Sequence, residues 1–147
     1  MFGWPGLIER ADGSFALAYE GHNLPHKYPR AFRQIRGGFL VWPKGRLVAV
    51  EAKELGEFTT VGIMPPGRKL RINALTQRAG GIRVEIATLL DEALPGRGFA
   101  ECMPIQGDQF WTPVTWNGQD DLGCGINQPI IVRFKMDHAK LFGLQFE

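Results

Sequence analysis

Apolar and polar residues alternate with a period of two along most of the chain. From residue 37 onward, a turn containing Gly or Pro follows about every ten residues. No segment keeps the 3.6-residue period of a helix for more than about two turns. The pattern therefore predicts an all-β fold, an antiparallel two-sheet β-sandwich or jelly roll of about eight to ten short strands. The expected strands after the first hairpin are 38–42, 46–51, 56–61, 69–75, 82–90, 114–116, 130–136 and 139–146.

The start of the chain predicts one further hairpin. Residues 6–20 read as two strands joined by an Asp12-Gly13 turn. A lone hairpin is marginally stable in water, so this one is expected to be the remnant of a larger sheet. A proline-rich loop follows, and Pro43 then begins a turn that predicts a second hairpin over 38–51. We accordingly expect a hairpin and linker over 1–36 and a β-sandwich domain over 37–147.

Composition and charge narrow the classes of partner. The 147 residues include 19 Gly and 10 Pro in a chain that is 44% apolar, which favours many turns. The net charge is +2 and the Lys and Arg residues are scattered, so no nucleic-acid partner is expected. No apolar run approaches a membrane span and no signal peptide is recognisable, so we expect no membrane partner and a cytoplasmic protein as encoded. Cys102 and Cys124 are then expected to be reduced thiols.

Four carboxylates fall in the loop-rich stretch 98–125. They are Glu101, Asp108, Asp120 and Asp121. Together with nearby amides and carbonyls they could form an oxygen-rich calcium site. The alternative is turn chemistry, in which Asp and Asn side chains bond their own backbone at Gly-rich bends. Asp120 and Asp121 are the better metal candidates, because adjacent like charges need a positive charge nearby.

Two histidines flank a proline in the N-terminal loop. His22 and His26 could act as a general base and its electrostatic partner in opening an ester or lactone. The alternative is a linker whose imidazoles are satisfied locally. The His-rich signature of dinuclear zinc lactonases is absent, and so is the Gly-x-Ser-x-Gly motif of serine esterases.

Several aromatic residues could bind a ligand. Phe110 and Trp111 lie between polar residues and are candidates for stacking on a sugar ring or covering an acyl chain. Trp42 and Trp116 adjoin apolar runs, which favours core positions for both.

Three blocks of sequence resemble one known module. The stretches 37–60, 82–118 and 130–147 look like the C-terminal β-sandwich that follows five-bladed propellers in large bacterial proteins distantly related to sucrase- and levanase-type glycoside hydrolases. Residues 5–30 resemble the last propeller blade and linker of those proteins. In that family, catalysis resembles two-carboxylate glycoside hydrolysis, with the acids on earlier blades. None of those acids has a matching position here, so the resemblance does not imply glycosidase activity.

Two functions of different classes follow. The chain is also similar to small metagenome-derived, quorum-quenching hydrolases of N-acylhomoserine lactones, although no motif carries this likeness. On that hypothesis Asp108 or Glu101 activates water and a bound cation polarises the carbonyl. The other hypothesis is a non-catalytic module that binds a small molecule or carbohydrate, or serves in assembly. In either case the unpartnered N-terminal hairpin predicts a homodimer through that segment.

Overall fold

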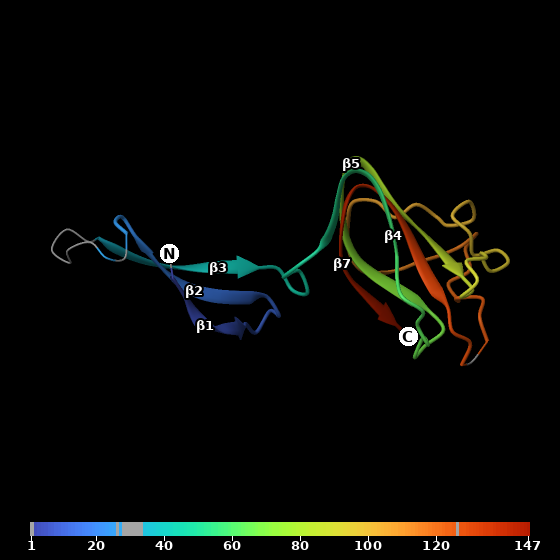
Figure 1. Cartoon of the computed structure of the whole chain (residues 1–147), viewed down its shortest axis with the longest axis horizontal. Coiled ribbons are helices and arrows are strands. Elements are labelled where there is room, and N and C mark those ends of the chain that lie inside the picture. The colour runs from blue at the N-terminus through green and yellow to red at the C-terminus, as the bar shows by residue number, and fades with distance from the viewer. Residues whose placement is uncertain (1, 26, 28–33, 126) are drawn as a thin grey trace. The chain divides into compact units, whose positions relative to one another are not determined.

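The computed structural model describes residues 2–25, 27, 34–125 and 127–147. Within these residues the chain has strands and no helix (Figure 1), and therefore no helix long and apolar enough to cross a membrane. The strands are β1 (Phe2–Glu9), β2 (Phe15–His22), β3 (Ile35–Trp42), β4 (Val50–Thr59), β5 (Leu70–Ala87), β6 (Asp108–Pro113) and β7 (Ile131–Phe146). They form two antiparallel sheets, so the predicted all-β class is confirmed and is consistent with a two-sheet β-sandwich.

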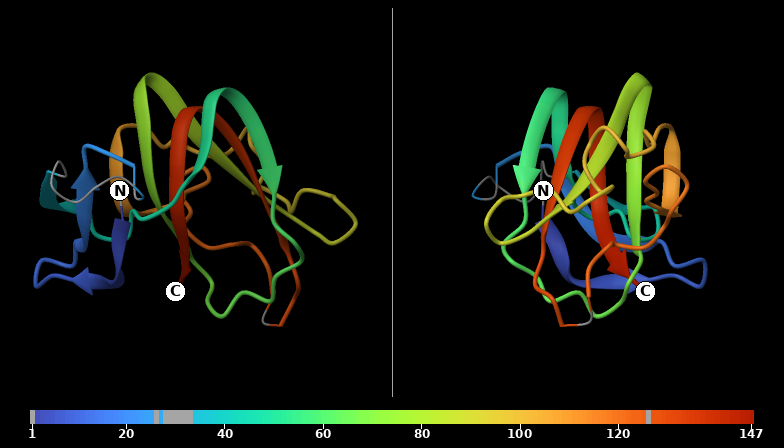
Figure 2. Two further views of the ribbon diagram at one scale, coloured as in Figure 1. Left: turned by 60° about the vertical axis from the view of Figure 1, so that its left-hand side comes forward. Right: turned by 90° about the vertical axis from the view of Figure 1, so that its right-hand side faces the viewer.

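The strands are fewer and longer than the sequence predicts. The expected strands 69–75 and 82–90 are the two halves of β5, and 130–136 and 139–146 are the two halves of β7. These two strands pair along nearly their whole length, with a register shift between Thr76 and Gly81. Figure 2 shows β5 and β7 arching over together. The segments that read as breaks are therefore bends within continuous strands.

Glycine at the bend explains this difference. Gly80 lies against β7 so closely that a Cβ there would collide with the carbonyl oxygen of Asp137 and lie 2.8 Å from that of His138. On β7 the bend is taken up by His138, whose φ is +44°, in the left-handed region. Because the bend keeps the even-numbered residues of β5 on one face, the buried side of the strand is the same before and after it.

The first compact unit spans Met1–Leu47 and contains the three-stranded sheet β1-β2-β3. Its β1–β2 hairpin turns at Gly13, whose φ is +77°, as the Asp12-Gly13 motif predicts. The predicted hairpin over 38–51 is wrong, because β3 pairs along all eight residues with β2 instead. This pairing draws β3 into the first unit, so the compact units divide after Leu47, whereas the sequence placed the boundary after residue 36.

The second unit, Val48–Glu147, contains the four-stranded sheet β4-β7-β5-β6 and the main core. Fully buried members of the core are Leu70, Ile72, Ile82, Val84, Ile86, Val114, Trp116, Ile130, Val132 and Phe134. Where β5 extends past β6, irregular segments provide hydrogen-bond partners for its backbone. Ile82 exchanges two backbone hydrogen bonds of 2.9 Å with Ile105. The Trp116 indole N–H donates to the Val84 carbonyl at 2.8 Å.

The predicted core positions are confirmed for one tryptophan and not for the other, and both cysteines are free. Trp116 is fully buried, as predicted, whereas Trp42 is only half-buried because it ends β3 in the smaller unit. Cys102 and Cys124 are buried free thiols, as expected. Burial raises the pKa of both thiols, which favours their protonated form.

Candidate functional site

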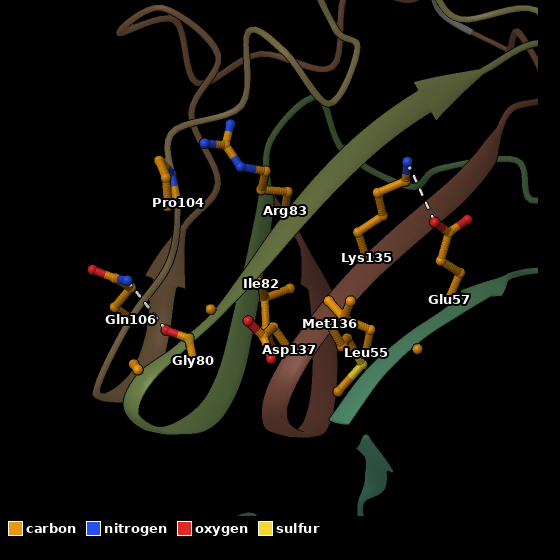
Figure 3. Close-up of a pocket in the computed structure, with 13 residues that line it drawn as sticks. Leu55, Glu57, Gly80, Ile82, Arg83, Pro104, Gln106, Lys135, Met136 and Asp137 are labelled. Atoms are coloured by element: carbon orange, nitrogen blue, oxygen red, sulfur yellow. Dashed lines mark hydrogen bonds and ion pairs between the residues drawn. The ribbon is translucent and has the colours of Figure 1, made fainter. Parts of the chain in front are cut away.

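A hollow opens on the second sheet beside the bend of β5 and β7 (Figure 3). Its volume is about 430 Å³, within the range of small-molecule sites. It is lined by residues 55–57 of β4, 79–83 of β5 and 135–137 of β7, with Pro104 and Gln106 from the segment along the β5 edge.

Strand register explains why these residues share the hollow. Glu57, Lys135 and Arg83 are cross-strand neighbours on β4, β7 and β5. In the next row, Asp137 lies between Leu55 and Gly81. Gly81 contributes no side chain, so the sheet itself forms the floor there. A Cβ on Gly81 would lie 3.7 Å from its nearest neighbours, Gln106 Cγ and the Ile105 carbonyl oxygen, so a methyl group fits there at ordinary van der Waals distance.

The side chains at the rim of the hollow are polar and are held in place by an ion pair, a cation–π contact and hydrogen bonds. Lys135 Nζ lies 3.3 Å from Glu57 Oε1 and 4.6 Å from the centre of the Phe99 ring. One terminal nitrogen of Arg83, Nη1, donates to the carbonyl oxygens of Phe99 and Cys102 at 3.0 and 2.8 Å. Gln106 donates to the Gly80 carbonyl at 3.2 Å. Strand and loop are thereby fixed around a preformed space.

A second hollow of about 350 Å³ shares Glu57 and Lys135 with the first. Its buried wall holds Glu85, which is 8% exposed and accepts a 2.7 Å hydrogen bond from Arg133 Nη1. Arg133 also pairs with Asp91. The bond to Glu85 is the main cause that raises the pKa of the Arg133 guanidinium. The ion pairs of Arg133 with Glu85 and Asp91 therefore link β7 to β5 and to the loop after it.

Glu101, a candidate general base, lies beside Glu85. A methyl group added at Gly98 would lie 2.8 Å from Glu101 Oε2 and 3.5 Å from Glu85 Oε2. Both carboxylates therefore lie on the same side of Gly98. Asp108 begins β6 opposite Leu75, on the other side of the β5 bend from Glu85. The structure thus brings Glu101 to a second carboxylate and places Asp108 elsewhere on the sheet.

The metal candidates Asp120 and Asp121 have cationic side-chain partners. Asp120 lies 2.7 Å from Lys69 Nζ, and Asp121 lies 2.8 Å from Arg97 Nη2. Asp121 also accepts the Gly123 N–H at 2.8 Å, as the turn interpretation predicts. That bond, and then Arg97, lower the pKa of the Asp121 carboxyl. Among the described residues, no group of three or more His, Cys, Asp or Glu side chains gathers as metal ligands; a calcium ion remains a prediction from the sequence.

The aromatic candidates lie on β6. Phe110 is exposed and makes an edge contact with Trp111, with ring centroids 6.1 Å apart. Trp111 is half-buried, and its ring lies over Gly143 of β7, where an added Cβ would be 2.9 Å from the indole. Its φ of +54° is uncommon for a bulky residue, and Arg71 donates to its carbonyl at 3.1 Å. The Trp111 ring therefore contacts the sheet at Gly143, and Phe110 is the more accessible aromatic.

The two histidine candidates belong to the first unit. His22 ends β2, and its Nε2 lies 3.7 Å from Glu20 Oε2. His26 lies outside the described residues, so its proposed role with His22 stays a prediction.

Sequence reasoning missed the three charged residues of the rim. Glu57, Arg83 and Lys135 each occupy a polar position of an alternating strand, where they read as ordinary solvent-facing residues. The signal that could have found them is the pairing of three such strands, which depends on the order β4-β7-β5. No family model, curated protein or solved structure matches this chain.

Proposed function

We propose that the chain is a ligand-binding β-module whose hollow at the β4–β7–β5 bend takes a small amphipathic molecule. Such a ligand has an oxygen-bearing polar head and a short apolar tail, a class that includes N-acylated lactones. The observation that carries the proposal is the preformed hollow of about 430 Å³, with a charged row on one side. On the other side lie Leu55, Pro104 and the bare backbone of Gly81, with Asp137 between Leu55 and Gly81.

Several features support binding as the main role. The lining combines apolar surface with a few polar groups that are already oriented, as small-molecule sites do. Because these polar side chains are already oriented before a ligand binds, less conformational entropy is lost on binding. By contrast, Glu101 lies near Glu85, whereas Asp108 lies opposite Leu75 on the other side of the β5 bend, so these two carboxylates do not face one substrate position.

Hydrolysis of a lactone or ester is a second candidate, supported by the position of Glu101 and Glu85 on the same side of Gly98. In this version Glu101 is the general base that activates water. Glu85 would hold the polar surroundings in place through Arg133.

One experiment separates the two candidates. N-octanoylhomoserine lactone is titrated into the protein by calorimetry, and acid release is followed in the same samples with and without EDTA. Binding without acid release supports the module. Acid release that is lost in Glu101→Gln and retained in Asp108→Asn supports the hydrolase.

A pocket-filling variant checks the location. Gly81→Val adds a side chain at the hollow, where the Cβ itself meets only ordinary van der Waals contacts, and is expected to weaken binding at least about tenfold. Gly37→Val, the same change in a strand of the first unit where a Cβ meets only the Tyr19 carbonyl oxygen at 3.9 Å, is the matched control. No binding by the native chain, or equal binding by both variants, would contradict the proposed site.

A further inference from the structure

The rim of the hollow carries an imbalance between its two cations. Lys135 is paired with Glu57 at 3.3 Å. Arg83, its cross-strand neighbour on β5, uses Nη1 to bind two neutral carbonyl oxygens. Within the described residues, no carboxylate lies within ion-pair distance of Arg83. The guanidinium is therefore tethered on one side by neutral groups.

This tether leaves part of the guanidinium available for a ligand. A guanidinium has five N–H donors in a planar fork that matches a carboxylate. With Nη1 directed at Phe99 and Cys102, the donors on Nη2 and Nε remain. Figure 3 shows Arg83 and Lys135 rising from neighbouring strands on the same side of the hollow, with Glu57 beyond Lys135. In that view the Arg83 guanidinium turns toward the Pro104 segment and the Lys135 ammonium toward Glu57, so an anion between the two side chains would be attracted by both charges.

The rest of the lining limits what that anion can be. Below the charged row lie Leu55 and the side-chain-free Gly81, with Pro104 on the facing segment. Asp137 lies between Leu55 and Gly81, and its carboxylate has a partner in His138 Nδ1 at 2.6 Å. Apolar surface beside the two neighbouring cations Arg83 and Lys135 suits a carboxylate that bears a short alkyl or acyl chain. A fully polar anion would gain nothing from this part of the lining.

We propose that the ligand of this hollow is an amphipathic carboxylate, that Arg83 and Lys135 bind its carboxylate group, and that Glu57 competes with it for Lys135. This inference rests on the proposed function, because it identifies the polar end of the ligand bound in the same hollow. It predicts that a medium-chain carboxylic acid binds more tightly than its neutral analogue.

The test compares octanoate with octanol by calorimetry on the full chain. The native protein is expected to bind octanoate more tightly, and added salt should weaken octanoate alone because it screens the charges. Glu57→Gln should tighten octanoate about three- to fivefold, and Lys135→Gln should weaken it by a similar factor. Octanol binding should be unchanged by both.

The chain offers matched controls. Lys140 and Glu51 form a corresponding pair between β7 and β4, with an N–O distance of 3.5 Å, and Lys140 is about as exposed as Lys135. Neither Lys140 nor Glu51 lines this hollow. Lys140→Gln and Glu51→Gln should therefore leave octanoate binding unchanged. Arg83→Lys keeps the charge and loses the fork, so it should weaken octanoate while octanol binding persists.

The outcomes distinguish this inference from the proposed function. Equal affinity for octanol and octanoate, or equal effects of the Lys135 and Lys140 variants, would overturn the anion site and leave the hollow as a binding site. No binding of either probe would overturn both.

Discussion

The Arg97–Asp121 pair shows how one residue fixes a loop in this chain. The Arg97 side chain is only 7% exposed, and it reaches Asp121 through the carboxylate and, from Nε, the backbone carbonyl at 2.7 Å. Its guanidinium also lies 5.7 Å from the centre of the Trp116 ring. The charge that the sequence assigned to a possible calcium site thus has a protein partner, and the pair ties segment 118–125 to the core.

Replacing Asp121 with Asn should destabilise the protein by about 1–2 kcal/mol at neutral pH, because Arg97 loses a charge-assisted hydrogen bond. The Asn oxygen can still accept the Gly123 N–H, so the turn is retained. The control is Asp120→Asn, which breaks only the exposed pair with Lys69 and should change stability by less than about 1 kcal/mol. Urea unfolding measures both.

The Arg97–Asp121 pair also predicts how the stability of the protein depends on pH. The folded pKa of Asp121 is lowered, so its contribution to stability is complete above the ordinary Asp value of 3.8 and is lost as the pH falls through the lower folded pKa. The difference in free energy of unfolding between the native chain and Asp121→Asn should therefore shrink on acidification. A difference that stays constant as the pH falls would contradict this assignment.

At the scale of elements, the bend in β5 and β7 is the feature that creates the hollow. The backbones of the two strands meet at Gly80, and the next residue, Gly81, forms the floor. The sequence showed the alternating halves of each strand correctly but not their continuity, since Gly80-Gly81 is also the usual signal of a turn. Trp116 was predictable as core because it ends an apolar run. The site residues Arg83 and Lys135 were not, because their proximity depends on pairing between distant strands.

Alanine substitution should separate the two glycines of the bend. Gly80→Ala forces the β7 backbone away and should destabilise the protein by about 1–3 kcal/mol or more, as overpacking does. Gly81→Ala adds a methyl group at ordinary van der Waals distance and should change stability by less than about 1 kcal/mol. Thermal and urea unfolding compare the pair. Equal losses would mean that the backbones do not meet at Gly80.

At the scale of the whole molecule, the two units differ in what they bury. All buried residues of the hydrophobic core cluster lie at position 70 or beyond. In the described part of the first unit, Ala16 is the one buried apolar residue. Phe39 and Val41 on β3 are 66% and 54% exposed. A sheet that buries so little of its own apolar surface gains little stability from folding.

Residues 48–147 should therefore fold without the first unit. The expected result is that a 48–147 fragment unfolds at the same urea concentration as the main transition of the full chain. Amide hydrogens of β1–β3 in the full chain should exchange faster than those of β5 and β7. An unfolded fragment would contradict the independence of the second unit.

The exposed apolar residues of β3 also carry the prediction of a homodimer through the N-terminal segment. Light scattering of the full chain should show concentration-dependent dimers, and the 48–147 fragment should remain monomeric. Replacing Phe39 and Val41 together with Thr keeps strand-forming residues and should weaken the dimer. A full chain that is monomeric at all concentrations would refute self-association.

The measurement that tests the central claim most directly is an NMR titration of the ¹⁵N-labelled full chain with octanoate. The account predicts saturable shifts of backbone amides at 55–57, 80–83 and 135–137, around the hollow of Figure 3. It predicts no comparable change at Phe110 or along β1–β3. Absence of shifts around the hollow, or stronger shifts at residues 108–113, would contradict it.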